Sequence, residues 1–400
     1  MQRQHIAVIG AGTAGLAAAI FLARQGHHIT LIEQAPALTP VGAGILLQPS
    51  GLAVLDLLGL RDQALQYGAR VDALYGDTMA GRVIMHTRYA DLGLPDQTHG
   101  LGIHRASLCH ILDRALAPLP HKRLMNTRVD AVTEQGNGVR LTLHRDGVTD
   151  ILEADAVLIA NGSSSQLRPP KLVRYDRQYP WGALWTMQPR PDTLTAPALR
   201  QRYDGCHTMA GILPTGSTPA QPDTPLVSVF WSLPVADMPA WREGRADLSA
   251  WRQQAETTWP DLAPLLAPLS SSRQLIPATY RDVIMRRWAQ GRIGVIGDAA
   301  HAMSPQLGQG ANMALADALA LAQSLSGAND WPDAWATYHR LRTGPIRFYQ
   351  RMSRALTPVF QSHSRSVALA RDLSFPLMYS VPWLRKQMAL TVSGLKTGLL

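Results

Sequence analysis

The chain opens on a short apolar run, a glycine-rich turn and a second, helix-forming apolar stretch. Residues 5–9 (HIAVI) are almost continuously apolar, the turn GAGTAG occupies 10–15, and 16–26 is rich in alanine and leucine. A second strand pattern, HHITLIE, follows at 27–33. Short apolar runs bounded by glycine predict strands buried on both faces, so residues 5–33 are expected to form a βαβ unit.

The remaining pattern alternates between helical and strand periods. Residues 104–118 have helical spacing, and 127–160 reads as short strands with turn signals at 136–138 and 146–147. The stretch 170–285 is rich in Pro, Trp and Thr and is expected to be mostly β, with a hairpin turn at Pro214-Thr215-Gly216. Further expected elements are a buried strand at 292–297, a helix at about 310–325 and mainly helices over the last 70 residues.

Composition places the chain among ordinary globular proteins. It has 400 residues, 46% hydrophobic and 17% charged, and no apolar run of membrane-spanning length. The first strand begins at once, which leaves no room for a signal peptide. Cys109 and Cys206 match no metal or redox spacing. These features predict a cytoplasmic protein with no metal site.

The net charge of +9 is carried by the C-terminal tail, because 340–400 holds eight Arg and two Lys against the single acid Asp372. A basic tail on a neutral body argues against nucleic-acid binding and for a more local role: a membrane surface, an acidic partner or a polar cover over the tail's own helices. Within it, five apolar residues fall in a narrow helical arc: Leu384, Met388, Val392, Leu395 and Leu399. Such a helix either lies on an anionic membrane or docks on the protein's own body.

The turn at 10–15 fits the dinucleotide-binding fingerprint in its proper setting, after a strand and opening a helix. Gly10 would permit the tight turn, Gly12 the close approach of a pyrophosphate, and Gly15 close packing of helix on strand. Glu33 ends the second strand, where an acid bonds a ribose hydroxyl. An acid there disfavours a 2′-phosphate, so the site suits FAD or NAD.

A second motif favours FAD. The segment 297–322, GDAAHAMSPQLGQGANMALADALALA, resembles the second FAD motif of the aromatic-hydroxylase (group A) flavoprotein monooxygenases, which include hydroxybenzoate and alkylquinolone hydroxylases. The resemblance implies that Asp298 binds the ribityl chain and that Pro305 and residues 308–312 lie against the isoalloxazine. A helix beginning near Gly310 would stabilise negative charge on the reduced ring.

Other segments resemble this family in the same order. Residues 41–60, with Gly42 and Gly44, resemble the loop and helix that pass over the flavin, and Arg105 resembles the arginine that contacts FAD. Asn161 stands where the family commonly has aspartate, although Ser165 and Arg168 keep the family spacing. The full set of expected FAD contacts is Gly10, Gly12, Thr13, Ala14, Gly15, Glu33, Gly44, Arg105, Val129, Asn161, Asp298, Pro305, Gly308, Gly310, Ala311 and Asn312. Because asparagine keeps the size but loses the charge, FAD binding should persist, and NADPH and NADH both remain open as donors.

The resemblance implies an α/β fold with an α+β insertion: a Rossmann-like FAD-binding domain, an inserted β-sheet substrate domain and a helical C-terminus. The expected segments are 1–72, 99–168 and 286–328 for the FAD-binding domain, 73–98 and 169–285 for the substrate domain, and 329–400 for the C-terminal helices.

The implied activity is hydroxylation of a small apolar or aromatic substrate with O2 and NAD(P)H through a flavin hydroperoxide, by a monomer or homodimer. An FAD-dependent dehydrogenase or reductase and a non-catalytic FAD-binding protein are the alternatives. Since the flavin carries the chemistry, only Pro305 and His301 are candidate catalytic residues, and His301 fits a structural role better. Candidate substrate contacts, each of which taken alone fits a core position better, are Trp181, Trp185, His207, Met209, Leu213 and Trp231.

Overall fold

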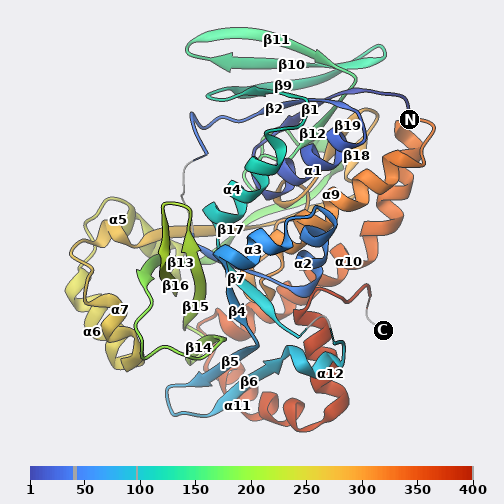
Figure 1. Cartoon of the computed structure of the whole chain (residues 1–400). Coiled ribbons are helices and arrows are strands. Elements are labelled where there is room, and N and C mark those ends of the chain that lie inside the picture. The colour runs from blue at the N-terminus through green and yellow to red at the C-terminus, as the bar shows by residue number, and fades with distance from the viewer. Residues whose placement is uncertain (39–42, 96–97, 399–400) are drawn as a thin grey trace.

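The computed structural model describes residues 1–38, 43–95 and 98–398 (Figure 1). Gly42 and Leu399 therefore lie outside the described residues. A six-stranded, mainly parallel sheet forms the centre of the upper half of the molecule in Figure 1. Its strands, in spatial order, are β18 (Ala289–Gln290), β19 (Ile293–Val295), β12 (Ala156–Ile159), β1 (His5–Ile9), β2 (His28–Ile32) and β8 (His121–Leu124).

The central strands of this sheet are short and apolar because both faces are covered. All four residues of β12 are buried, as are four of the five in β1. Helices α4 (Arg105–Leu116) and α9 (Gly310–Ser326) both pack against α1 (Thr13–Arg24). The expected βαβ unit and the helices at 104–118 and 310–325 are confirmed.

An antiparallel three-stranded sheet stands above the parallel sheet in Figure 1. It consists of β9 (Arg128–Gln135), β10 (Gly138–Arg145) and β11 (Val148–Ala154). Its two turns fall where the sequence predicts them, with positive φ at Gly136, Asp146 and Gly147. Val139, Leu141 and Leu143 of β10 join the core of the parallel sheet.

A seven-stranded sheet forms the second half of the molecule. Its spatial order is β17 (Ile276–Met285), β13 (Val173–Pro189), β16 (Gln221–Pro234), β15 (Thr208–Thr218), β14 (Ala198–Asp204), β5 (Ala73–Thr78) and β6 (Val83–Arg88). A smaller sheet holds β3 (Gly44–Leu47), β7 (Gly100–His104) and β4 (Ala69–Val71). Strands from 73–88 and 173–285 thus share one sheet, although they are far apart in the chain.

The hairpin turn expected at 214–216 is wrong, because these residues belong to strand β15. The register between β15 and β16 shifts around Gly216, whose φ is +69°, and the turn itself lies at 219–220. Gly216 therefore marks a β-bulge and not a chain reversal, which the sequence alone does not distinguish.

Short helices pack on one face of the seven-stranded sheet. Helices α5 (Met238–Arg242), α6 (Leu248–Thr258) and α7 (Ala263–Leu266) interrupt the stretch expected to be mostly β. They enclose a tryptophan-rich core with Trp231, Trp241, Trp251 and Trp259. The remaining helices are α2 (Pro49–Leu57), α3 (Arg61–Tyr67), α8 (Asp298–His301), α10 (Trp331–Phe360), α11 (Arg365–Ser380) and α12 (Pro382–Val392).

The helices α10, α11 and α12 form the C-terminal part of the molecule. Helix α10 packs on α9, and α11 and α12 pack on β6 at the bottom of Figure 1. The predicted class, an α/β fold with an inserted β-sheet and a helical C-terminus, is confirmed. In the part of the chain that the structure describes, no helix is both long enough and apolar enough to cross a membrane.

Candidate cofactor and substrate site

Three strands of the parallel sheet end side by side. Ile9 of β1 pairs with Ile32 of β2 on one side and with Ile159 of β12 on the other. The carboxyl ends of these strands therefore bring Gly10, Glu33 and Asn161 to one edge, and all three line a cavity of about 860 Å³. In open α/β sheets ligands bind at this edge, where the strand order reverses.

The three glycines of the first motif have different surroundings. A Cβ added to Gly10, whose φ is +102°, would lie 2.6 Å from the Ala160 carbonyl oxygen, and one added to Gly15 would lie 1.9 Å from that of Gly10. A Cβ added to Gly12 would meet nothing within 4 Å, and Gly12 lines the cavity. Gly10 and Gly15 are thus required by the fold, whereas Gly12 keeps space open for a ligand.

Helix α1 begins at this space. Its first turn starts at Thr13, no side chain caps it, and Thr13 and Ala14 line the cavity. Unpaired N–H groups and the helix dipole make such a terminus a binding site for anions. Beside it, the Glu33 carboxylate accepts hydrogen bonds from the Ala11 N–H (2.8 Å) and the Ala35 N–H (2.9 Å). Each oxygen retains a lone pair for a ligand hydroxyl.

The second motif forms the adjoining wall. Asp298 is the first residue of α8, is exposed toward the cavity, and makes no capping hydrogen bond. Its Oδ1 lies 3.7 Å from where a Cβ on Gly310 would be, at the start of α9. Between them, the 3₁₀ turn Pro305–Leu307 ends on Gly308, with φ +60°. Asp298 is therefore not an ordinary N-cap, and it lines the cavity.

Most of the predicted FAD contacts line this one cavity: Gly10, Gly12, Thr13, Ala14, Glu33, Gly44, Arg105, Val129, Asn161, Asp298, Pro305, Gly308, Gly310 and Ala311. Gly15 does not, because it is packed on Gly10. Arg128, beside Val129 on β9, is a lining cation that the sequence reasoning missed. No motif marks Arg128, although its neighbour Val129 is among the predicted contacts.

Asn312 acts on the wall and not in the cavity. Its Oδ1 accepts from the Gln48 N–H (2.8 Å), and its Nδ2 donates to the carbonyl oxygens of Gly308 (3.0 Å) and Leu46 (3.2 Å). The buried amide thereby fixes the segment after β3 against the start of α9. The side chain therefore has a positioning role, and the expectation that the backbone of residues 308–312 lies against the flavin stays a prediction.

His301 also lies away from the cavity, in a buried polar cluster. Its Nε2 is 2.6 Å from Asp317 Oδ2, which also accepts from the Gly297 N–H (2.8 Å), while Arg342 Nε donates to Asp317 Oδ1 (2.7 Å). Burial acts to raise the pKa of Asp317, but His301, Arg342 and the Gly297 N–H outweigh it and hold that pKa well below the usual value. This buried pairing supports the structural role that the sequence favours for His301.

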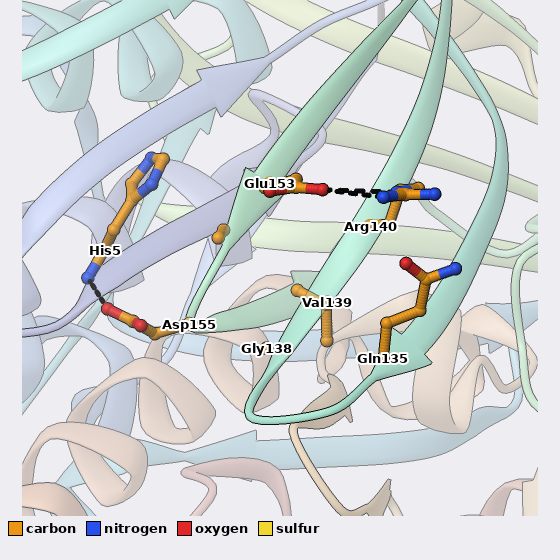
Figure 2. Close-up of a pocket in the computed structure, with 8 residues that line it drawn as sticks. His5, Gln135, Gly138, Val139, Arg140, Glu153 and Asp155 are labelled. Atoms are coloured by element: carbon orange, nitrogen blue, oxygen red, sulfur yellow. Dashed lines mark hydrogen bonds and ion pairs between the residues drawn. The ribbon is translucent and has the colours of Figure 1, made fainter.

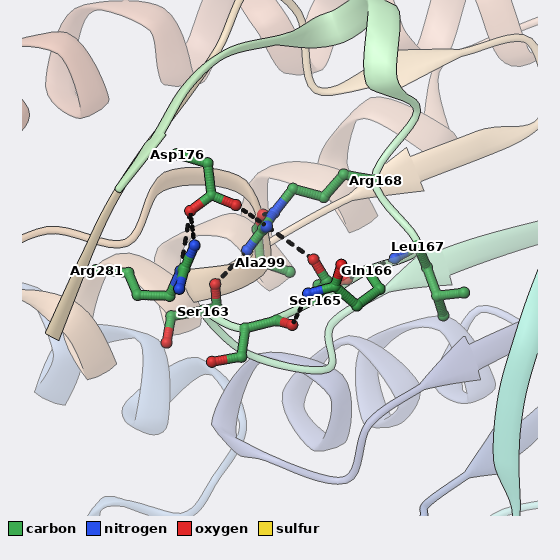
Figure 3. Close-up of polar contacts among 9 residues, drawn as sticks. Ser163, Ser165, Gln166, Leu167, Arg168, Asp176, Arg281 and Ala299 are labelled. Carbon is green, nitrogen blue, oxygen red and sulfur yellow. Dashed lines mark hydrogen bonds and ion pairs between the residues drawn. The ribbon is translucent and has the colours of Figure 1, made fainter. Parts of the chain in front are cut away.

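Arg168 has a comparable structural role after β12 (Figure 3). Its guanidinium donates to the carbonyl oxygens of Ser163, Ser165 and Ala299 and pairs with Asp176 at 2.8 Å. Asp176 is paired in turn with Arg281. The cluster ties the loop that carries Asn161 and Gly162 to α8, so it holds two walls of the cavity in register.

The other end of the cavity lies between the seven-stranded sheet and α10–α12. Of the candidate substrate contacts, Trp185, Met209 and Leu213 line it. Trp181, His207 and Trp231 are not among the described lining residues. Trp231 points away because side chains alternate along a strand, so that Phe230 faces the cavity and Trp231 joins the tryptophan core. Trp181 packs on His363, and His207 is exposed at the β14–β15 turn.

The C-terminal helices form a further wall of the cavity, although the candidate substrate contacts all came from the stretch 170–285. Leu384, Met388 and Val392 of the predicted apolar arc line the cavity, and Leu395 packs against a neighbouring core cluster. The four described residues of this arc therefore dock on the protein's own body. The other wall residues from these helices are Met352, Leu356, Phe360, Gln361, Phe375, Met378, Tyr379, Gln387 and Thr391.

A second hollow of about 360 Å³ lies at the outer sheet (Figure 2). Arg140 is paired with Glu153 at 2.9 Å, and Asp155 accepts from the His5 N–H at 2.7 Å. Because its polar groups satisfy one another, it offers little to a ligand.

Comparison with known proteins matches the same regions. A family model described as FAD binding domain matches residues 3–343. The chain is 32% identical over 379 residues to 3-amino-4-hydroxybenzoate 2-monooxygenase of Streptomyces cremeus, covering 89% of this chain and 87% of that protein. It is 29% identical over 364 residues to 6-hydroxynicotinate 3-monooxygenase of Bordetella bronchiseptica, covering 88% and 91%. The solved tetrameric form of 2-methyl-3-hydroxypyridine-5-carboxylic acid oxygenase has 26% identity and a TM-score of 0.74, covering 94% and 98%.

Proposed function

This chain belongs to the FAD binding domain family and is an FAD-dependent monooxygenase, and from that premise we propose that it hydroxylates a small apolar or aromatic compound held beside the flavin ring. The observation that carries the proposal is the single cavity of about 860 Å³, which joins both nucleotide motifs to a chamber lined by aromatic and aliphatic side chains. Dinucleotide and substrate would thus meet inside one enclosure.

The residues present fit FAD. The pyrophosphate would lie over Gly12 at the start of α1, where an added Cβ has nothing within 4 Å. Glu33 would accept from a ribose hydroxyl, and Asp298 from the ribityl chain. Arg105 and Arg128 would face the negative charge of the phosphates, because both line this end of the cavity. Asn161 would lie beside the pyrophosphate without adding charge.

Bound FAD, reduced by NADPH or NADH, supplies the activation of O2. The chain's own contribution is positional. The uncapped start of α9 at Gly310 is directed at the cavity and would stabilise negative charge on the ring. Asn312 holds that helix start against the segment after β3. The walls from α10, α11 and α12 would enclose the substrate and exclude water.

We expect the FAD-loaded protein to oxidise NADPH or NADH faster when a suitable ring compound is present, and to consume O2 as it does so. With ¹⁸O2 gas, the product should gain one ¹⁸O atom, measured by mass spectrometry on 4-hydroxybenzamide and 4-hydroxybenzoate as probes. Running both donors in parallel decides between NADPH and NADH. Turnover of a probe under strict anaerobiosis would instead indicate a dehydrogenase or reductase.

A membrane contact, if formed, would not use the predicted arc on α12, because that arc lines the cavity; we propose instead an exposed face of α11 and the start of α12. Leu369, Leu373 and Leu377 form a stripe on α11, with exposed fractions of 62%, 55% and 68%, and Trp383 at the start of α12 is 66% exposed. Arg365 and Lys386 are exposed at either end of this stripe. An apolar stripe flanked by cations fits the interface of an anionic bilayer.

Vesicles containing phosphatidylglycerol are therefore expected to co-sediment the protein, and vesicles of phosphatidylcholine alone to do so much less. Changing Leu369, Leu373 and Leu377 together to glutamate should abolish co-sedimentation while flavin content stays unchanged. Val148→Glu with Ile151→Glu is the matched control, because these residues are also exposed apolar side chains, on β11. Equal sedimentation of the α11 variant and the wild type would refute the contact.

A further inference from the structure

The charged side chains that line the cavity all lie outside its substrate end. We define the substrate end as the lining residues contributed by the seven-stranded sheet and by α10, α11, α12 and Gln361, which follows α10. The lining charges are Glu33, Arg105, Arg128 and Asp298, which belong to the nucleotide-binding segments. Among the lining residues that the structure describes, the substrate end holds apolar, Thr, Gln and Tyr side chains only.

Strand β14 shows how this neutrality arises. Leu199, Gln201 and Tyr203 face the cavity, and the alternation of a strand sends Arg200 and Arg202 to the opposite face. There Arg200 pairs with Asp261 at 2.7 Å and Arg202 with Asp77 at 2.8 Å. A strand that contains two arginines therefore presents none of that charge to the chamber.

One cation lies behind the wall, but it is already neutralised. Arg371 stacks on the outer sides of Tyr203 and Phe360, with its guanidinium carbon 5.1 and 5.6 Å from the two ring centres. It is 2% exposed and pairs with Asp372, with Nε 2.8 Å from Oδ1. The rings separate it from the cavity.

The tyrosines of the wall are also uncharged at ordinary pH. Burial raises the pKa of Tyr280 and of Tyr379 to about 12 and that of Tyr203 further. No lining group of the substrate end therefore changes its charge between about pH 5 and 9.

One buried amide at this end offers a hydrogen bond. Gln361 is 4% exposed, and its Oε1 accepts from Gln306 Nε2 at 2.8 Å. Its Nε2 has no partner among the described residues. A buried donor without a partner is costly, so a ligand acceptor at this point would be bound favourably. Gln306 belongs to the turn that begins at Pro305, so this donor stands where the two ends of the cavity meet.

From this geometry we propose that the substrate end takes an uncharged aromatic compound bearing a carbonyl or similar acceptor, bound by Gln361, and rejects aromatic carboxylates. Burying a carboxylate where no cation compensates it costs far more than burying an amide of the same shape. This proposal rests on the proposed function. The substrate it describes is uncharged, whereas the compounds in the names of the two relatives, 6-hydroxynicotinate and 3-amino-4-hydroxybenzoate, are carboxylates.

The test compares matched pairs that differ only in charge. Dissociation constants of 4-hydroxybenzamide and 4-hydroxybenzoate, and of 2-aminobenzamide and 2-aminobenzoate, are measured on the FAD-loaded protein from the change in flavin absorbance. At about pH 7.5 both acids are ionised. We expect each amide to bind more than about tenfold tighter than its acid. If the dissociation constant of the acid exceeds that of the amide by less than about tenfold in both pairs, or if neither amide binds, the inference is overturned.

The variant Gln361→Leu tests the donor. This variant should raise the dissociation constant of 4-hydroxybenzamide about tenfold. The dissociation constant of phenol, which is the same ring without the carboxamide, should stay within about twofold of the wild-type value. Equal losses for both ligands would show that Gln361 acts only through packing and would overturn its assigned role. Binding is measured without turnover, so failure of the proposed function has a separate signature, in which an amide binds but neither stimulates NAD(P)H oxidation nor consumes O2.

Discussion

Replacing Asp317 with alanine is expected to lower the free energy of unfolding by about 3–5 kcal/mol, because it leaves the buried guanidinium of Arg342 without its counter-charge. The Gly297 N–H and His301 lose their partner as well. Denaturant unfolding followed by circular dichroism measures the change. The matched control is Glu153→Ala, which removes the exposed pair with Arg140 and should cost less than about 1 kcal/mol.

The same carboxyl makes stability depend on pH in a defined direction. The pKa of Asp317 is depressed in the folded protein, so its stabilisation is complete above the unfolded value of about 4 and is lost as pH falls below it. The wild type should therefore lose stability between about pH 4 and 2 more steeply than Asp317→Ala does. The role assigned to Asp317 would be contradicted if the free energy of unfolding fell equally steeply with pH in the two proteins. A difference in that free energy of less than about 1 kcal/mol at neutral pH would also contradict it.

Gly12→Val is expected to abolish FAD binding while the apoprotein stays folded. Gly12 has φ −81° and ψ −173°, an extended conformation open to any residue, so valine introduces no backbone strain. Its side chain would enter the space over the start of α1, where the pyrophosphate is proposed to bind, and we expect FAD affinity to fall at least about 100-fold. The measurement is the flavin absorbance of purified protein beside the melting temperature of the apoprotein.

Two other glycines provide the controls. Gly327→Val makes the same change at a site where an added Cβ also meets nothing within 4 Å but which does not line the cavity, so flavin content should be normal. Gly15→Val should prevent folding, because its Cβ would lie 1.9 Å from the Gly10 carbonyl oxygen. Normal flavin content in Gly12→Val would place the pyrophosphate elsewhere.

Local sequence patterns predicted most of the residues that line the cofactor end of the cavity. The strand, turn and helix at 5–24 are contiguous, and the spacing of Gly10, Gly12 and Gly15 reflects backbone geometry within a few residues. The same holds for Asp298, Pro305 and Gly308, which lie in one short segment. The patterns did not predict side-chain contacts between segments that are distant in the chain. Asn312 belongs to the motif, yet its side chain binds Gln48 and Leu46, which are far away in the chain.

The substrate end was predicted only in part, because its residues come from many elements. Trp231 and Phe230 are equally apolar and adjacent, and only the register of β16 in the sheet decides which one faces the cavity. His301 sits in a motif beside ligand-facing residues, but the packing of α9 and α10 turns it toward Asp317.

By itself the sequence determined the class of fold, the family and the cofactor end, because glycine turns, buried strands and helix starts are set by interactions between neighbours in the chain. The tertiary structure decided what shapes and charges the substrate end. It placed Gln361 and one face each of α11 and α12 in the wall, and it turned Arg200 and Arg202 outward to their acidic partners. These outcomes depend on which face of a strand or helix meets the rest of the protein, and that is fixed only when distant segments pack together.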